Sequence, residues 1–222
     1  IIVTSDHGEN LGGLGLYSEH ATADHPTCHI PMIVKWQGAQ RGAVDRALHY
    51  SLDLCPTVAE LLQVEKCDRW DGVSYAPSLM GEFSAGRPYL VLSQMAHVCQ
   101  RSVRFGDWLY MRTYHDGFHL FPKEMLYNLA EDPHEQHDLA ADMPEICDHA
   151  VRLYLQWHDE AMLRNPDGGD PLWSVMNEGG PYHIWNAFDT YLDRLEHTGR
   201  ADGAAMLREK YGRSPYNGEK RR

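Results

Sequence analysis

Residues 1–31 read IIVTSDHGENLGGLGLYSEHATADHPTCHIP. The first four residues form a short, mostly apolar run, which predicts a strand buried on both faces. The polar cluster Ser-Asp-His-Gly-Glu follows at once, at 5–9. Side chains just past the carboxyl end of a strand in an α/β sheet lie where ligands bind, so Asp6 and His7 are candidate site residues. A carboxylate oxygen and a neutral imidazole nitrogen together suit a divalent cation.

Three more histidines follow before the next apolar run. They are His20, His25 and His29, and the run at 31–36, PMIVKW, predicts a second strand. A polar turn alone could also contain Asp-His-Gly. Four imidazoles in one strand–loop–strand unit exceed what a surface turn needs, which favours a functional site. A structural role is the better interpretation for His25 and His29, whereas His20 is either a site residue or an exposed loop histidine.

These residues together resemble a known family. The sequence looks like the second half of the catalytic domain of sulfatases, which belong to the alkaline phosphatase superfamily. The resemblance lies in residues 1–9, the glycine-rich loop, Glu19-His20 and residues 29–36. Gln37 is a departure, because the family usually reads Trp-Pro-Gly there. The resemblance implies that Asp6 and His7 are two ligands of a single divalent ion, most often calcium. It places His20 where the family has a cationic residue that contacts the sulfate and the bridging oxygen, as a catalytic and substrate-binding group; no residue is expected to bind another cofactor.

The chemistry of sulfate ester cleavage fits these roles. The nucleophile attacks sulfur while the alcohol oxygen leaves with developing negative charge. A metal ion polarises the sulfuryl oxygens, and a cationic or acidic group stabilises the leaving oxygen. An imidazole can donate a proton near neutral pH, which a carboxylate of ordinary pKa cannot do.

A second stretch supports the resemblance independently. Strand-like runs at 89–93, 101–105 and 108–112 include a hairpin turn at 106–107, and EMLYNLAEDPHE follows at 124–135. Sulfatases close with a small antiparallel sheet whose last strand typically reads Leu-Tyr-Asp-Leu-x-x-Asp-Pro-x-Glu. The predicted fold is therefore α/β and alkaline-phosphatase/sulfatase-like: the C-terminal part of the main mixed sheet, plus a small antiparallel-sheet subdomain with helices.

The expected division is into three segments. Residues 1–86 would complete the catalytic α/β domain, 87–164 would form the small subdomain with its packing helix, and 165–222 a helical tail. Apolar spacing predicts helices within 46–64, from 142 onward, within 184–195 and over 201–211. The glycine turn at 177–181 is the segment of the tail best suited to cover an active-site mouth.

The family's nucleophile motif is missing. Sulfatases use a formylglycine made from the first residue of Cys/Ser-x-Pro-x-Arg, and the nearest approaches, at Cys28, Cys55 and Ser74, all fail to match. The chain also opens inside an apolar strand without a Met. We therefore expect the C-terminal part of a longer sulfuric ester hydrolase, with the nucleophile upstream and this chain inactive on its own.

The overall charge and composition of the chain limit the kinds of partner that it can bind. The net charge of −12 argues against nucleic acid, and no apolar segment is long enough to span a membrane. Five cysteines without a CxxC pair slightly favour a cytoplasmic setting, although a periplasmic or secreted one stays open because a leader would lie upstream. The expected partner is a sulfated small molecule or saccharide, and a homo-oligomer is possible.

Other functions fit the same residues. Two-zinc phosphatases and phosphodiesterases of the superfamily would use His7 for one zinc and His20 for the other, and phosphonate monoester hydrolases share the formylglycine machinery. A non-catalytic, partner-binding derivative of such an enzyme is the third alternative. The residues do not identify the substrate.

Overall fold

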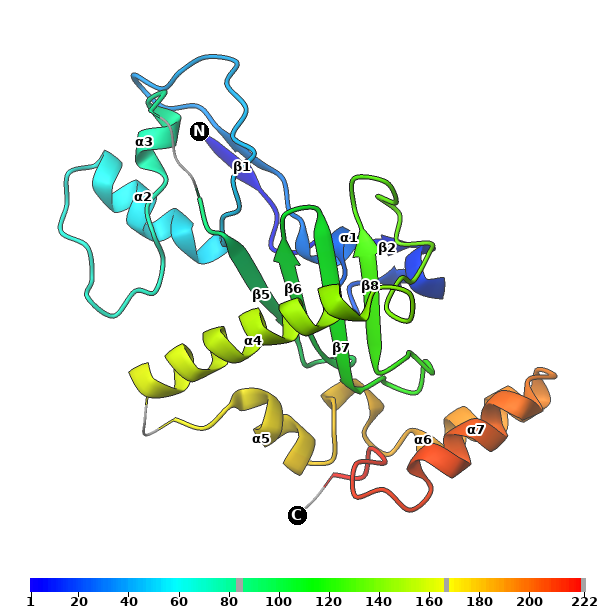
Figure 1. Cartoon of the computed structure of the whole chain (residues 1–222). Helices are drawn as coiled ribbons and strands as arrows, with labels where there is room; N and C mark the ends of the chain where they lie inside the picture. Colours follow the sequence, from blue (N-terminus) through cyan, green and yellow to red (C-terminus); the bar gives the residue numbers. More distant parts are fainter. Residues whose placement is uncertain (83–85, 166–167, 221–222) are drawn as a thin grey trace. The chain divides into compact units, whose positions relative to one another are not determined.

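The computed structural model of the protein describes residues 1–82, 86–165 and 168–220. These fall into two compact units, one formed by Ile1–Asp6 and Ile30–Leu90, the other by His7–His29 and Val91–Arg222. Figure 1 shows their elements. The three-segment division expected from the sequence stays a prediction. Residues 83–85 of its first segment and residues 166, 167, 221 and 222 of its third lie outside the described residues.

The first unit contains both strands predicted near the N-terminus. Strand β1 (Ile2–Thr4) pairs antiparallel with β4 (Met32–Val34). The prediction that the first strand is buried on both faces is wrong for this chain, since Val3 is 52% exposed and its cross-strand partner Ile33 is 64% exposed. The physical reason is that β1 and β4 form a sheet of only two strands within the described residues, and the face that carries Val3 and Ile33 is left uncovered.

A buried carboxylate organises the rest of this unit. Asp53 ends the 3₁₀ turn Ser51–Asp53, just before helix α2 (Leu54–Leu61), and accepts bonds from the Tyr50 and Val73 amides at 2.8 and 2.7 Å. Arg87 donates to it at 2.6 Å. Burial raises the pKa of Asp53, but these bonds outweigh it and hold the pKa below its ordinary value. Asp53 therefore links the start of α2 to two later segments, and the short helix α3 (Ala76–Leu79) lies between them in the sequence.

The second unit is built on a four-stranded sheet in the order β5-β6-β7-β8. Its strands are Tyr89–Gln94, Cys99–Phe105, Trp108–His115 and Glu124–Asn128. β6 and β7 form an antiparallel hairpin that turns at Gly106, and β7 pairs antiparallel with β8. The strand runs and the hairpin predicted from the sequence are confirmed.

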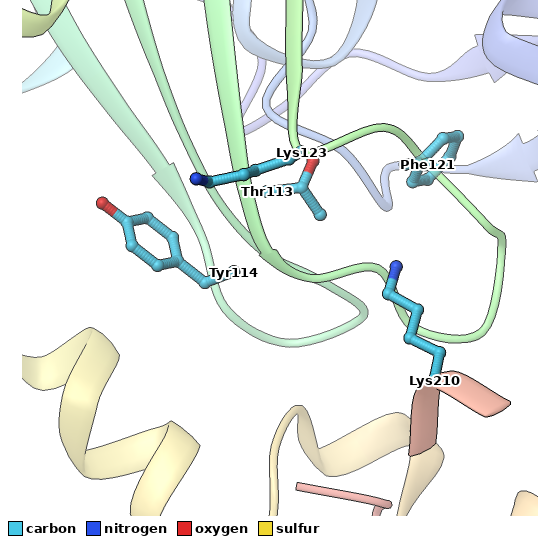
Figure 2. A pocket seen from close by; sticks show the side chains of 5 residues that line it. All are labelled: Thr113, Tyr114, Phe121, Lys123 and Lys210. Carbon is cyan, nitrogen blue, oxygen red and sulfur yellow. The ribbon is translucent and has the colours of Figure 1, made fainter. Parts of the chain in front are cut away.

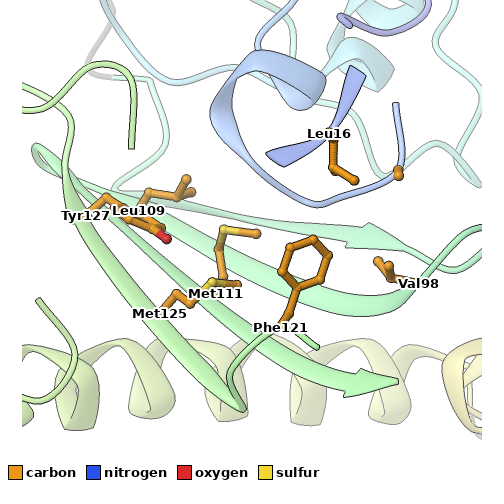
Figure 3. Close-up of a cluster of buried hydrophobic side chains, with 8 residues drawn as sticks. Leu16, Val98, Leu109, Met111, Phe121, Met125 and Tyr127 are labelled. Atoms are coloured by element: carbon orange, nitrogen blue, oxygen red, sulfur yellow. The ribbon is translucent and has the colours of Figure 1, made fainter. Parts of the chain in front are cut away.

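The two faces of this sheet are covered differently. Helix α4 (Pro144–Arg164) runs along one face (Figure 1). The loop of residues 7–29 packs on the other face, where Leu16 meets Met111 and Phe121 (Figure 3). That core consists of Leu16, Ala21, Val98, Leu109, Met111, Phe121, Met125 and Tyr127. The sheet is therefore the platform that positions the loop after the Asp-His-Gly turn.

The tail folds into short helices. They are α5 (Pro171–Asn177), the 3₁₀ turn η3 (Tyr182–Ile184), α6 (Phe188–His197) and α7 (Ala201–Tyr211). The helix predicted over 201–211 is confirmed, whereas the one predicted within 184–195 begins only at Phe188. None of the described helices is long and apolar enough to cross a membrane.

A buried ion pair holds the tail to the sheet. Arg101 on β6 is 3% exposed and Asp170, which caps α5, is 8% exposed. Their two hydrogen bonds measure 2.8 and 2.6 Å, and Arg101 also donates to Tyr154 of α4 at 2.9 Å. A paired guanidinium and carboxylate fix orientation because both bonds must form together.

Replacing Asp170 with Ala should lower the free energy of unfolding by about 3–5 kcal/mol, because it leaves the Arg101 guanidinium buried and unpaired. Urea unfolding measures this loss. The matched control is Glu196→Ala, which removes the exposed pair with Arg208 and should cost less than about 1 kcal/mol of pairing energy. Equal losses in the two variants would contradict the assigned role of the buried pair.

Candidate functional site

The site begins with a close approach that only glycine allows. The Gly8 amide donates to the Thr27 carbonyl at 2.8 Å. A Cβ at Gly8 would lie 1.8 Å from the carbonyl oxygen of Pro26. The chain therefore turns tightly after His7, against the far end of its own loop.

This turn places His7 on His20. Their ring centroids are 3.9 Å apart and the rings are tilted by 23°. His20 Nδ1 also lies 3.5 Å from a carboxylate oxygen of Glu9. Potential ligand atoms of His7, Glu9 and His20 all lie within 4.8 Å of one another. The hairpin of β2 (Asn10–Leu11) and β3 (Tyr17–Glu19), paired at Asn10 and Glu19, brings these residues together.

The structure thus joins two of the three site residues predicted from the sequence. Asp6 belongs to the first compact unit, whereas His7 and His20 belong to the second. The roles of all three residues stay predictions. Glu9 was missed, although it belongs to the same polar cluster at 5–9. Its only signal was its place two residues after His7 in that cluster.

The ligand atoms of this group can be compared with the preferences of divalent cations. Two imidazole nitrogens and a carboxylate oxygen suit a divalent cation, and imidazoles are typical of zinc and other transition metals. Calcium prefers a shell made of oxygen ligands alone. The group His7–Glu9–His20 therefore fits a divalent ion, and by itself it fits zinc better than calcium.

Two further histidines extend the cluster. His97, in the connection between β5 and β6, lies with its ring centroid 5.5 Å from that of His20. His183, in η3 of the tail, stacks on His97 at 3.9 Å with the rings 6° from parallel. His7, His20, His97 and His183 form what we call the imidazole row. Burial lowers the pKa of His97, and the neighbouring His183 lowers it further.

A buried polar network fixes the loop that carries His7 and His20. Asn10 donates to Asp24 at 2.6 Å, and Asp24 accepts from the Thr27 amide at 3.1 Å at the start of helix α1 (His25–Cys28). Glu135 accepts from the His25 amide at 2.8 Å. The His20 carbonyl accepts from the Gln94 side chain at 2.7 Å, which ties the loop to the sheet.

A cavity of about 390 Å³ lies elsewhere in the second unit. Figure 2 shows that the Lys123 side chain extends toward Tyr114, whereas Lys210 projects from the tail on the other side of Thr113. The lining residues are Thr113, Tyr114, Phe121, Lys123 and Lys210, so the cavity does not contain the imidazole row.

Comparison with known proteins agrees with this picture. Residues 1–64 match the family model for Sulfatase. The resemblance to the sulfatase family is confirmed. Over 148 residues the chain is 28% identical to the uncharacterized sulfatase YidJ of Escherichia coli (strain K12), an alignment covering 64% of this chain and 28% of YidJ. Over 151 residues it is 29% identical to the delta 4,5-hexuronate-2-O-sulfatase of Bacteroides thetaiotaomicron, covering 64% and 30%.

Solved structures show the same fold. A 2-O GAG sulfatase matches with a TM-score of 0.60 and 24% identity, over 77% of this chain and 39% of that one. The phosphonate monoester hydrolase of Silicibacter pomeroyi matches with a TM-score of 0.56 and 24% identity, over 74% and 35%. The α/β fold of the alkaline phosphatase and sulfatase type is therefore confirmed. The chain spans less than a third of the length of the two sulfatases that it matches in sequence.

Glu135 predicts a specific pH dependence of stability. Burial and the nearby Asp24 raise the pKa of Glu135 to about 8, from an ordinary 4.5. The folded chain therefore holds a proton that the unfolded chain releases, and Glu135 costs stability increasingly as the pH rises from its unfolded pKa to about 8. Glu135→Gln should remove this cost, so its urea midpoint should exceed that of the wild type at pH 9 more than at pH 5. Glu131→Gln, on the exposed side of the same turn, is the control, and the same shift in both variants would refute the assignment.

Proposed function

We propose that the protein of which this chain is a part hydrolyses sulfate esters, and that this chain supplies the metal-binding and leaving-group side of the active site. The observation that carries the proposal is the group His7–Glu9–His20, which lies within the region matched by the Sulfatase family model. The stacked imidazoles and the carboxylate lie at the turn where the family places its metal ligands. His7 and Glu9 are exposed, so their side chains do not fill the core.

The remaining machinery would come from outside this chain. The nucleophile is expected to be a formylglycine upstream, so this chain alone should be inactive. Asp6 and His7 would bind one divalent cation, with Glu9 as a further donor. When bound, such a cation polarises the sulfuryl oxygens.

His20 would act on the leaving group. Its imidazole can donate a hydrogen bond or a proton to the alcohol oxygen as negative charge develops there. Glu9, 3.5 Å from Nδ1, would keep the ring oriented, and the bond from Gln94 to the His20 carbonyl fixes the backbone beneath it. Residues whose own positions are held by packing and hydrogen bonds can keep a reactive geometry without reorganising.

We propose a sulfated saccharide as the substrate. Two similar proteins support this class: one is named a delta 4,5-hexuronate-2-O-sulfatase. The other, a solved structure with a TM-score of 0.63 and 19% identity that shares the fold alone, holds D-glucosamine-2-N,6-O-disulfate. A phosphonate monoester is the second candidate, because phosphonate monoester hydrolases from two bacteria share this fold. A homo-oligomer stays a prediction.

In the full-length protein, His20→Ala should lower kcat for an aryl sulfate by about 10²–10⁴-fold, because the leaving oxygen loses its proton donor. The control is His137→Ala, whose side chain is 82% exposed, and it should keep the wild-type rate. Sulfate release is measured beside release from an aryl phosphate and a phosphonate monoester. A His20→Ala variant with wild-type kcat would contradict the catalytic role, and turnover of the phosphonate alone would favour the second candidate.

Metal dependence gives a separate prediction. Chelation should abolish turnover of the full-length protein, and a divalent cation should restore it. The family resemblance predicts that calcium restores turnover. Restoration by zinc alone would instead indicate that the imidazole nitrogens are the ligands. His7→Ala should weaken cation binding in calorimetry by at least about 100-fold, since loss even of an outer hydrogen-bond partner of a ligand costs 10–100-fold. Unchanged affinity would show that His7 is not a ligand.

A further inference from the structure

We propose that His97 and His183 form a substrate subsite that binds a second anionic substituent, a sulfate or a carboxylate, on the sugar whose ester is cleaved. The proposal rests on the proposed function of His20, because it takes His20 as the group beside the scissile ester. It adds two specificity-determining residues, one of them from the tail.

The position of His97 is the first argument. Its ring is half-buried and lies edge-to-face with that of His20, with 5.5 Å between centroids. A sugar whose ester oxygen is at His20 would therefore present its neighbouring substituents to His97. His97 precedes Val98, which is fully buried in the sheet core, so the backbone that carries the ring is fixed.

The second argument is that His183 belongs to the same surface. Its ring stacks on His97 almost in parallel, and its amide donates to the Ala96 carbonyl at 3.2 Å. Stacking occupies ring faces and leaves ring edges, which carry the N–H groups, able to meet a ligand. Within the described residues neither ring makes a side-chain hydrogen bond, so both donors remain available.

The tail is anchored well enough to preorganise His183. The carboxylate of Asp116, fully buried, accepts from the Tyr211 hydroxyl at 2.8 Å and pairs with Lys210 at 2.5 Å. Ile184, next to His183, packs with Phe118 in a core that joins the β7–β8 connection to the tail. A binding group that is already ordered does not lose that entropy when the ligand arrives.

The chemistry favours an anion. Sulfate and carboxylate oxygens only accept hydrogen bonds, which matches two neighbouring donors, whereas a hydroxyl must also find an acceptor. The titratable groups that face His97 are three imidazoles, His183, His20 and His119, against one carboxylate, Glu19. Burial and the neighbouring imidazoles lower the pKa of His97, so the ring meets an anion as a neutral N–H donor.

The test compares two probes with the full-length protein. Binding of a disulfated glucosamine and of its monosulfated counterpart is measured by calorimetry for wild type, His183→Ala and His197→Ala. His197 is an exposed histidine of the same tail and serves as the matched control. His183→Ala should weaken binding of the disulfated sugar about tenfold, as expected for one charge-assisted hydrogen bond, and leave the monosulfated sugar unchanged.

His97→Ala should reproduce this selective loss, and the double variant should lose more than either single variant, because each ring donates its own hydrogen bond to the same group. Equal effects on both sugars, or an effect of His197→Ala as large as that of His183→Ala, would overturn the subsite. Sulfate release is followed in parallel. A wild type that binds the sugars without releasing sulfate would count against the proposed function, while the binding comparison still decides the subsite.

Discussion

The burial of one loop segment against the small sheet is the constraint on which the site depends. Ala21, Thr22, Ala23 and Asp24 are all fully buried, although two of the four side chains are polar. Each buried polar group needs a hydrogen-bond partner. Because only a few conformations of this segment supply all the partners, the segment is held in one of them. The Ala23 amide, for example, donates to the side chain of Gln100 on β6 at 3.2 Å. The loop is therefore held as firmly as the sheet, and His20, directly before this segment, is held with it.

The same logic extends to the tail. One of the contacts that hold the tail, and with it His183, is at the β7–β8 connection, where Asp116 bonds the tail's own Tyr211 and Lys210. The loop with His7 and His20 and the tail with His183 thus rest on one scaffold, the four-stranded sheet. Under the two proposals, changes in the tail alter which sugar is accepted and leave His20, the proposed leaving-group donor, in place.

Local patterns predicted the local features well. The turn after the first strand, the hairpin at Gly106, and helix α7 (Ala201–Tyr211) all follow from residues adjacent in sequence. Burial of β1 was predicted wrongly, because a run of apolar residues cannot reveal how many neighbours its strand has. His97 and His183 were missed for a related reason. Each is a single histidine without a motif around it, and only the folded chain brings it to His20.

The central claim is that rings from three separate segments form one row. Nuclear Overhauser effects between histidine ring protons test this most directly, with the full-length protein selectively labelled at histidine. The account predicts cross-peaks between His7 and His20, between His20 and His97, and between His97 and His183, whose ring centroids are 3.9, 5.5 and 3.9 Å apart. The His97–His183 cross-peak should vanish in His183→Ala while the His7–His20 cross-peak persists. A folded protein without the His20–His97 cross-peak would contradict the account.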